Sequence, residues 1–385
     1  MEATSQAAPP VAPKPTPTPP TRGGGGMPRL QEAGLIVVIL LIALLLTFAG
    51  GSIVVRGQTV NNFFRLDNLL PNVFTPISWM AIMAVGVTFV IIAGGIDISV
   101  GSIFGLAALG AAAALQTLGE EAPAWKVLPI AVAVPLGIGL ACGLVNGALV
   151  VGLRMHPFIV TLATMSIFRG IALVSTTSGS LPSEGYLPNA FTRDFMTWTV
   201  KYTRAGGPPI NLQPVPMIIM FIVVIIAAIY LGLTVAGREN YAVGGNEEAA
   251  RFSGLRVWWI KLRVYALSGL LAGLAGMVNC GYYGSAATNT GEGYELMVVA
   301  AAVVGGASLS GGRGTALGAM LGALVIQLID NGIFILKKIN LGLFELSLSK
   351  EYSKIIIGIA ILVAVAVDQL SEHLRNRRLA GAKRK

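Results

Sequence analysis

Asp97 is an acidic residue among long apolar stretches, and its side chain has the most distinctive chemistry there. It lies in the segment GGIDISVG, residues 94–101, between two long apolar runs. A carboxylate within or beside a membrane span is costly unless it faces water, backbone donors or a partner. The glycines around it permit a broken helix whose free N–H groups could bind the carboxylate. Two interpretations are open: Asp97 and Ser99 shape the gate or wall of a pathway, or Asp97 caps a helix that begins at Ile98.

A second glycine-rich segment, GGASLSGG at residues 305–312, echoes the first one. Repeats with glycine-interrupted helices are typical of transporters, where they surround a path near the middle of the bilayer. Chance similarity in a glycine-rich chain is the alternative. The predicted spans give both copies the same direction, whereas an inverted repeat needs opposite directions, so the type of repeat stays open. The aligned pairs are Gly94 with Gly305, Gly95 with Gly306, Ser99 with Ser310, and Gly101 with Gly312.

Other polar side chains lie inside apolar runs. Asn146, Thr161 and Thr164 could hydrogen-bond a hydroxylated solute, or they could bond between helices. Arg169 must pair, face a cavity or extend to the membrane surface, and Asp330 is a conceivable partner for it. The candidate path residues are therefore Gly94, Gly95, Asp97, Ser99, Asn146, Thr161, Gly305, Gly306 and Ser310.

The longest polar interruption in the second half of the chain, residues 237–263, contains a small helix with both ends marked. Asn246 is a good N-cap, and Glu247 and Glu248 place negative charge in the first turn. Gly254 stands where a C-terminal glycine can turn left-handed. A two-turn helix is not stable alone in water, so it is either a capped surface helix or one held by a partner. The residues between these ends include Ala249, Ala250 and Arg251.

The composition indicates a polytopic membrane protein of the all-α class. Of 385 residues 54% are hydrophobic and 12% are charged, and the mean hydropathy is +0.74. About ten runs are long enough to cross a bilayer. They cover roughly 34–54, 73–94, 101–118, 127–152, 157–177, 214–236, 263–285, 295–309, 315–336 and 354–370. We expect a disordered Pro/Gly-rich tail over 1–30, a membrane domain over 31–371 and a basic tail over 372–385.

An even number of spans places both termini on one side, and the distribution of Lys and Arg favours the cytoplasm. The lysines between 337 and 354 argue locally against this orientation. Residues 237–263 are then cytoplasmic, and the loop 178–213 faces outside and contacts whatever delivers the solute. The net charge of +9 is concentrated in flanking segments, so it does not indicate nucleic-acid binding.

Several chemistries have no motif in this chain. GGRGTALG at 311–318 lacks the lysine of a phosphate-binding loop, so the chain should not hydrolyse ATP itself. We find no catalytic motif, no cofactor motif and no metal-binding spacing. Cys142 and Cys280 lie in apolar segments and are expected to be small core residues.

The segment AVGGNEEAARFSG resembles the cytoplasmic coupling loop of ATP-binding-cassette importer permeases, in the branch for ribose and related sugars. GGIDISVGS, LVNGALV at 144–150, HPFIVTLATMSIFRGIALV at 156–174 and the stretch 293–324 are similar to the same family. The similarity extends over about 34–370. Departures are Met297, where an acidic residue is usual, Asp330 with Asn331, where an asparagine pair is common, and a longer insertion around 337–354.

This resemblance implies a permease that imports a monosaccharide such as ribose, xylose or galactose. It implies that the coupling loop lies in a cleft of a separate ATP-hydrolysing subunit, that two permease chains line one path in the cell membrane, and that an extracytoplasmic binding protein supplies the solute. Two alternatives stay open. One is a permease of the same family for a nucleoside or another small solute, and the other is a self-sufficient carrier or channel whose site lies at the glycine repeats.

Overall fold

The computed structural model describes residues 27–366, apart from 56, 204–208, 337, 341–344, 348–351, 361 and 364–365. Residues 1–26 of the predicted disordered tail and the predicted basic tail 372–385 lie outside this range. The first described element, α1, begins at Met27.

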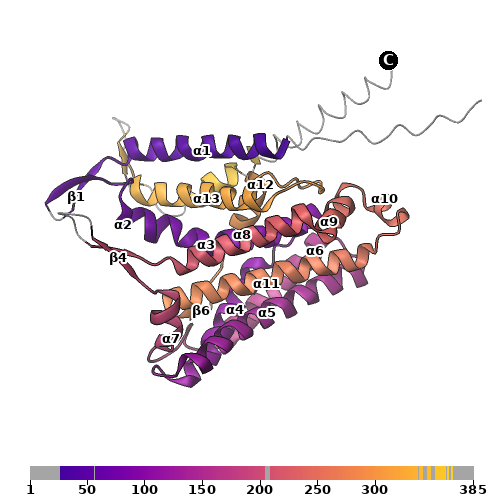
Figure 1. Ribbon diagram of the computed structural model, residues 1–385, viewed down its shortest axis with the longest axis horizontal. Helices are drawn as coiled ribbons and strands as arrows, with labels where there is room; N and C mark the ends of the chain where they lie inside the picture. The colour runs from indigo at the N-terminus through magenta and orange to yellow at the C-terminus, as the bar shows by residue number, and fades with distance from the viewer. Residues whose placement is uncertain are drawn as a thin grey trace, which may run out of the picture.

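The described chain is mainly helical (Figure 1). The first group of helices is α1 (Met27–Ala49), α2 (Leu66–Leu69), a π-helical turn (Leu70–Phe74), α3 (Pro76–Ile92), α4 (Val100–Leu115), a 3-10 turn (Gln116–Leu118), α5 (Ala124–Gly152), α6 (Pro157–Val174) and α7 (Asn189–Phe191), followed by a π-helical turn (Thr192–Met196). The second group is α8 (Val215–Leu233), α9 (Val235–Gly245), α10 (Glu247–Phe252), α11 (Val257–Tyr283), α12 (Tyr294–Val304) and α13 (Ala316–Leu336).

Short strands form antiparallel pairs between the helices. They are β1 (Ser52–Val55) with β2 (Gln58–Asn61), β3 (Ser180–Leu181) with β6 (Ala286–Ala287), β4 (Val200–Thr203) with β5 (Pro209–Leu212), and β7 (Lys338–Asn340) with β8 (Glu345–Ser347). These pairs are too small to form a sheet layer, so the fold consists mainly of helices.

Eight helical segments within the described residues are long and apolar enough to cross a membrane, which confirms the polytopic, all-α prediction. One predicted span differs from the structure, and another is described only in part. The span predicted over 295–309 is α12, which has only 11 residues and is about 16 Å long, about half the thickness of the hydrocarbon core. In the span predicted over 354–370, residues 352–360 are helical, and much of the remainder lies outside the described residues.

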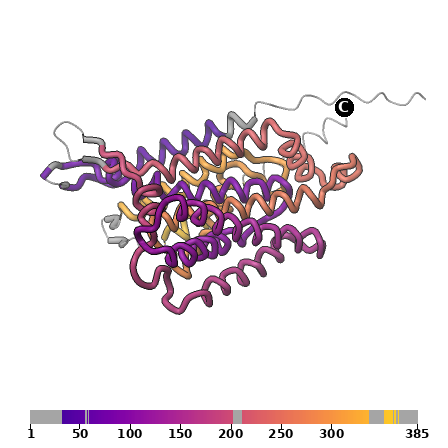
Figure 2. Tube along the Cα trace, turned by 60° about the horizontal axis from the view of Figure 1, so that its bottom comes forward, coloured from indigo at the N-terminus to yellow at the C-terminus, as the bar shows by residue number. Residues whose placement is uncertain are grey.

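Helix α3 occupies the centre of the bundle. Its residues from Ile77 to Ile92 are all buried, as expected for a helix that is apolar around its whole circumference. Helices α11, α13, α12 and α8 surround it. The long helices lie side by side along the longest axis of the molecule in both views (Figures 1 and 2).

Helices α5 and α11 approach each other through glycines. A Cβ atom on Gly139 would meet the carbonyl of Gly269, and one on Gly269 would meet the carbonyl of Gly139. Gly143 and Gly273 take part in the same contact. Both helices therefore present glycines four residues apart, which is the spacing that permits close packing of membrane helices.

A reciprocal pair of amides joins the beginning of this bundle to its last long helix. Asn68 in α2 and Asn331 in α13 donate to each other's side-chain oxygens at 3.1 and 3.0 Å, and both residues are buried. Asn68 also donates to the carbonyl of Phe63. These bonds satisfy polar groups that apolar helices surround.

Candidate functional site

The predicted caps of the small helix are confirmed in α10. The Asn246 side-chain oxygen accepts the backbone N–H of Ala249 at 2.9 Å, and Glu247 and Glu248 occupy the first turn. After the last turn Gly254 has a φ of +85°, the left-handed conformation expected at that position. Helix α9, which fills most of the polar interruption before α10, was not predicted from the sequence.

Helix α10 is fixed to the start of α11 by an ion pair and an apolar contact. Glu247 accepts from Lys261 at 2.6 Å and from Arg251 at 3.1 Å. The hydrogen bond from Lys261 is the main cause that lowers the pKa of the Glu247 carboxyl below its ordinary value. Ala250 is buried in an apolar cluster with Val243, Val257 and Ile260.

The opposite face of α10 has no cover within the described residues. Glu248 and Ala249 are exposed, and the Phe252 side chain is 84% exposed. An exposed aromatic ring beside an acidic first turn is a surface suited to a protein contact.

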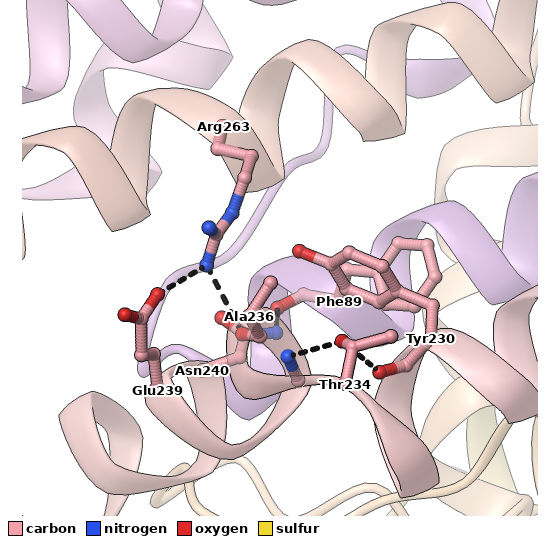
Figure 3. A network of polar contacts seen from close by, with 8 residues as sticks. Phe89, Tyr230, Thr234, Ala236, Glu239, Asn240 and Arg263 are labelled. Atoms are coloured by element: carbon pink, nitrogen blue, oxygen red, sulfur yellow. Dashed lines mark hydrogen bonds and ion pairs between the residues drawn. The ribbon is translucent and has the colours of Figure 1, made fainter.

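Helix α9 is joined to α8, α3 and α11 by polar contacts (Figure 3). Arg263 of α11 donates to the Glu239 carboxylate at 3.2 Å and to the carbonyl of Ala236 at 3.0 Å. Asn240 donates to the carbonyl of Phe89 in α3 at 3.1 Å. Thr234 accepts the N–H of Gly237 and so caps α9. Helix α9 is therefore bonded to both α3 and α11.

The two glycine-rich breaks meet at the C-terminal end of α9. Gly312 donates its N–H to the carbonyl of Ile92 at 2.9 Å, and the Tyr241 hydroxyl donates to the carbonyl of Gly314 at 2.7 Å. A Cβ atom on Gly244 would collide with the Ile92 carbonyl. We call residues 92–95, 244–245 and 311–314 the glycine junction. The two breaks resemble each other in sequence, but no sequence signal predicts that α9 contacts both.

Both breaks begin with the same helix end. After α3, Gly94 N–H bonds to Ile91 and Gly95 N–H to Val90; after α12, Gly306 N–H bonds to Val303 and Ala307 N–H to Ala302. Gly94 and Gly306 have φ values of +77° and +92°, which glycine adopts without strain. The structural equivalent of Gly94 is therefore Gly306, one residue later than in the sequence alignment.

Both breaks contribute to the glycine junction, so the two copies meet there through equivalent helix ends. They differ after the shared helix end: α4 begins at Val100, eight residues after α3 ends, and α13 begins at Ala316, twelve residues after α12 ends. Accordingly Ser99 is buried, whereas its aligned counterpart Ser310 is exposed.

Asp97 is fully buried and its carboxylate accepts three hydrogen bonds. The backbone N–H and the hydroxyl of Ser99 donate to Oδ1 at 3.0 and 2.7 Å, and the hydroxyl of Ser268 in α11 donates to Oδ2 at 2.9 Å. Asn146 in α5 donates to the Ser99 hydroxyl at 2.7 Å. The helix after Asp97 begins at Val100 and not at Ile98, so Asp97 bonds the chain just ahead of that helix.

Three other polar residues that the sequence analysis considered bond to the protein itself: Thr161, Arg169 and Asp330. Thr161 bonds to the carbonyl of Pro157 at 3.0 Å and reaches that of Ile96 at 3.4 Å. Arg169 donates to the carbonyl of Thr290 at 2.7 Å. Asp330 accepts from Ser353, so the conceivable pairing of Arg169 with Asp330 is absent from the described residues.

The helical architecture and its eight candidate spans within the described residues define a polytopic membrane protein. A family model described as "Branched-chain amino acid transport system / permease component" matches residues 69–365, and the chain belongs to this family. It is 42% identical over 307 residues to the ribose import permease protein RbsC of Escherichia coli (strain K12), covering 80% of this chain and 87% of that protein.

Two further relatives extend the comparison. The ribose import permease protein RbsC of Bacillus subtilis (strain 168) is 36% identical over 312 residues, 80% of this chain and 86% of that protein. The galactose/methyl galactoside import permease protein MglC of Escherichia coli (strain K12) is 35% identical over 316 residues, 80% of this chain and 88% of that protein.

Proposed function

We propose that this chain is the membrane-spanning subunit of an ATP-binding-cassette importer and that it translocates a monosaccharide of the ribose, xylose or galactose type. The relatives named for ribose and galactose import support the solute class. The observation that carries the proposal is the position of α10, which has one uncovered face and is linked through α9 to both helix breaks.

In this proposal the uncovered face of α10 binds a separate ATP-hydrolysing subunit. Closure of that subunit moves α10, the Glu247–Lys261 pair carries the movement to α11, and Asn240 and Tyr241 carry it to the two breaks. Switching requires contacts that differ between two states, and a helix held by few polar bonds supplies them. The residues predicted to line the path or gate act around these breaks. They are Gly94, Gly95, Asp97, Ser99, Asn146, Thr161, Gly305, Gly306 and Ser310.

The remaining partners follow from the same assignment. An extracytoplasmic binding protein delivers the solute at the end of the bundle that carries residues 178–213, a second copy of this chain completes the path, and lipid covers the exposed apolar faces of α1, α6 and α8. Both termini and α10 are then cytoplasmic, as the distribution of basic residues predicts. The chain itself has no catalytic role.

Co-purification with a candidate ATPase subunit tests the proposal. The Glu247→Lys, Glu248→Lys double variant should lose the ATPase while the chain still folds. Single variants refine this test, because Glu247 is already paired with Lys261 and Arg251, whereas Glu248 has no ion pair within the described residues. If the Glu248→Lys variant alone loses the ATPase subunit, the loss is therefore due to the contact with the partner and not to the internal ion pair.

A negative outcome is equally clear. If wild type binds no ATPase and vesicles that contain this chain alone accumulate sugar, the chain is a self-sufficient carrier and the importer proposal is wrong.

A further inference from the structure

A cavity of about 380 Å³ lies between α4, the last turns of α11 and the start of α12. This volume falls within the range of about 300–1,000 Å³ that is typical of small-molecule sites. Phe104 and Asn279 are buried at its floor, while Tyr283, Asn289 and Glu292 form an exposed rim. None of these five residues belongs to the predicted path.

The wall formed by residues 284–293 is held in place from two sides. Arg169 in α6 donates to the carbonyl of Thr290 at 2.7 Å. Gly291 packs so closely on α4 that a Cβ atom on it would collide with the carbonyl of Gly101. Because backbone contacts fix this loop, the side chains of Asn289 and Glu292 remain available at the cavity.

The polar groups of the cavity are suited to hydroxyl groups. Asn279 is only 7% exposed, it lines the cavity, and none of the hydrogen bonds in the described part of the chain uses its side chain. This side-chain amide offers both a donor and an acceptor to a ligand in the cavity. Glu292 adds a carboxylate acceptor at the rim.

Aromatic rings supply the apolar part of the wall. Phe104 and Tyr294 stack with centroids 5.7 Å apart and an interplanar angle of 18°. Tyr283 packs against Trp79 with centroids 5.8 Å apart. A few convergent polar groups between flat apolar surfaces are typical of sites that orient a small ligand.

We propose that this cavity is the solute-contact site of the permease and that it takes one monosaccharide ring. The side chains of Asn279, Asn289 and Glu292 bind hydroxyl groups, and the rings of Tyr283 and Tyr294 cover the C–H faces of the sugar. This inference rests on the proposed function, because the cavity meets a sugar only if the chain transports one.

The test uses membrane vesicles with the whole transporter, including its ATP-hydrolysing subunit and binding protein, and D-ribose as the probe. Asn279→Leu and Glu292→Gln should each lower initial uptake by about tenfold at equal amounts of chain, the effect of one lost hydrogen bond of about 1.4 kcal/mol. Co-purification of the ATPase should not change. Asp67→Asn changes an exposed acidic residue outside both the cavity and the loop 178–213, so it is the matched control and should behave as wild type.

Two further results separate the possible failures. If Asn279→Leu does not accumulate in the membrane, Asn289→Ala and Glu292→Gln decide, because both residues are exposed on the rim. Rim variants that import D-ribose within about twofold of wild type overturn the inference. If wild type with its ATPase bound imports none of D-ribose, D-xylose and D-galactose, the proposed solute class is wrong, and the sugar site falls with it.

Discussion

Gly312 donates its backbone N–H to the carbonyl of Ile92 at 2.9 Å, so the two helix breaks are joined backbone to backbone. Gly244 lies against the same carbonyl with no room for a side chain. Three segments from distant parts of the chain therefore form one unit, in which α9 contacts both breaks.

Substitution of Gly244 tests this junction. Gly244→Ala places a methyl group against the Ile92 carbonyl and should destabilise the protein by about 2 kcal/mol or more, as overpacking does. Gly245→Ala is the matched control, because a Cβ atom there meets nothing within 4 Å. Thermal unfolding in detergent measures the stability of each variant, and sugar uptake measures its transport activity. Equal behaviour of the two variants would contradict the close packing.

The hydrogen bonds of Asp97 predict different costs for two substitutions. Asp97→Ala leaves the hydroxyls of Ser99 and Ser268 without their acceptor in a buried site and should cost about 2–4 kcal/mol. Asp97→Asn keeps an oxygen for Ser99 and should cost about 1 kcal/mol. The melting temperatures of the two variants check the order. The same loss for both would show that the bonds to Asp97 do not hold the break.

The Glu247 carboxyl predicts a pH dependence of the α10–α11 contact. Its pKa is lowered, mainly by the hydrogen bond from Lys261, so its contribution to stability is present above the unfolded-state pKa and is lost as the pH falls through the folded-state pKa. Glu247→Gln should lower the melting temperature at neutral pH by at most about 3 °C, because the pair is partly exposed. The difference from wild type should disappear in acid. A difference that persists well below the ordinary carboxyl pKa would refute the assignment, and Glu248→Gln is the control.

The amide pair predicts non-additive effects. Asn68→Leu or Asn331→Leu leaves the other amide buried without its partner and should cost about 1–3 kcal/mol. The double variant should cost less than the sum of the two single variants, because no unpaired amide of the pair remains. Thermal unfolding of the four proteins completes the cycle. Additive losses would mean that the two residues do not interact.

Local features of α10 could be predicted from the sequence because their chemistry is local. The oxygen of Asn246 reaches an N–H only three residues away, and Gly254 needs only a backbone that turns left-handed after Arg251 and Phe252. The same holds for most spans, whose length and hydropathy identify them.

Contacts between distant residues could not be predicted in this way. Asp97 and Ser268 are 171 positions apart, and Arg169 and Thr290 are 121 apart; neither pairing has a signal in one sequence. The short α12 was also missed, because its apolar run continues into the glycine-rich break and gives the composition of a full span. Its true end depends on packing against α3 and α13.

The glycine junction also constrains the order of assembly during synthesis. The chain is made from its N-terminus, so Asn240 can reach Phe89 before residues 311–314 have left the ribosome. Until then the carbonyl of Ile92 and the hydroxyl of Tyr241 lack the partners that they have in the finished protein. Closure of this corner is therefore a late event of biogenesis, because it waits for residues 311–314.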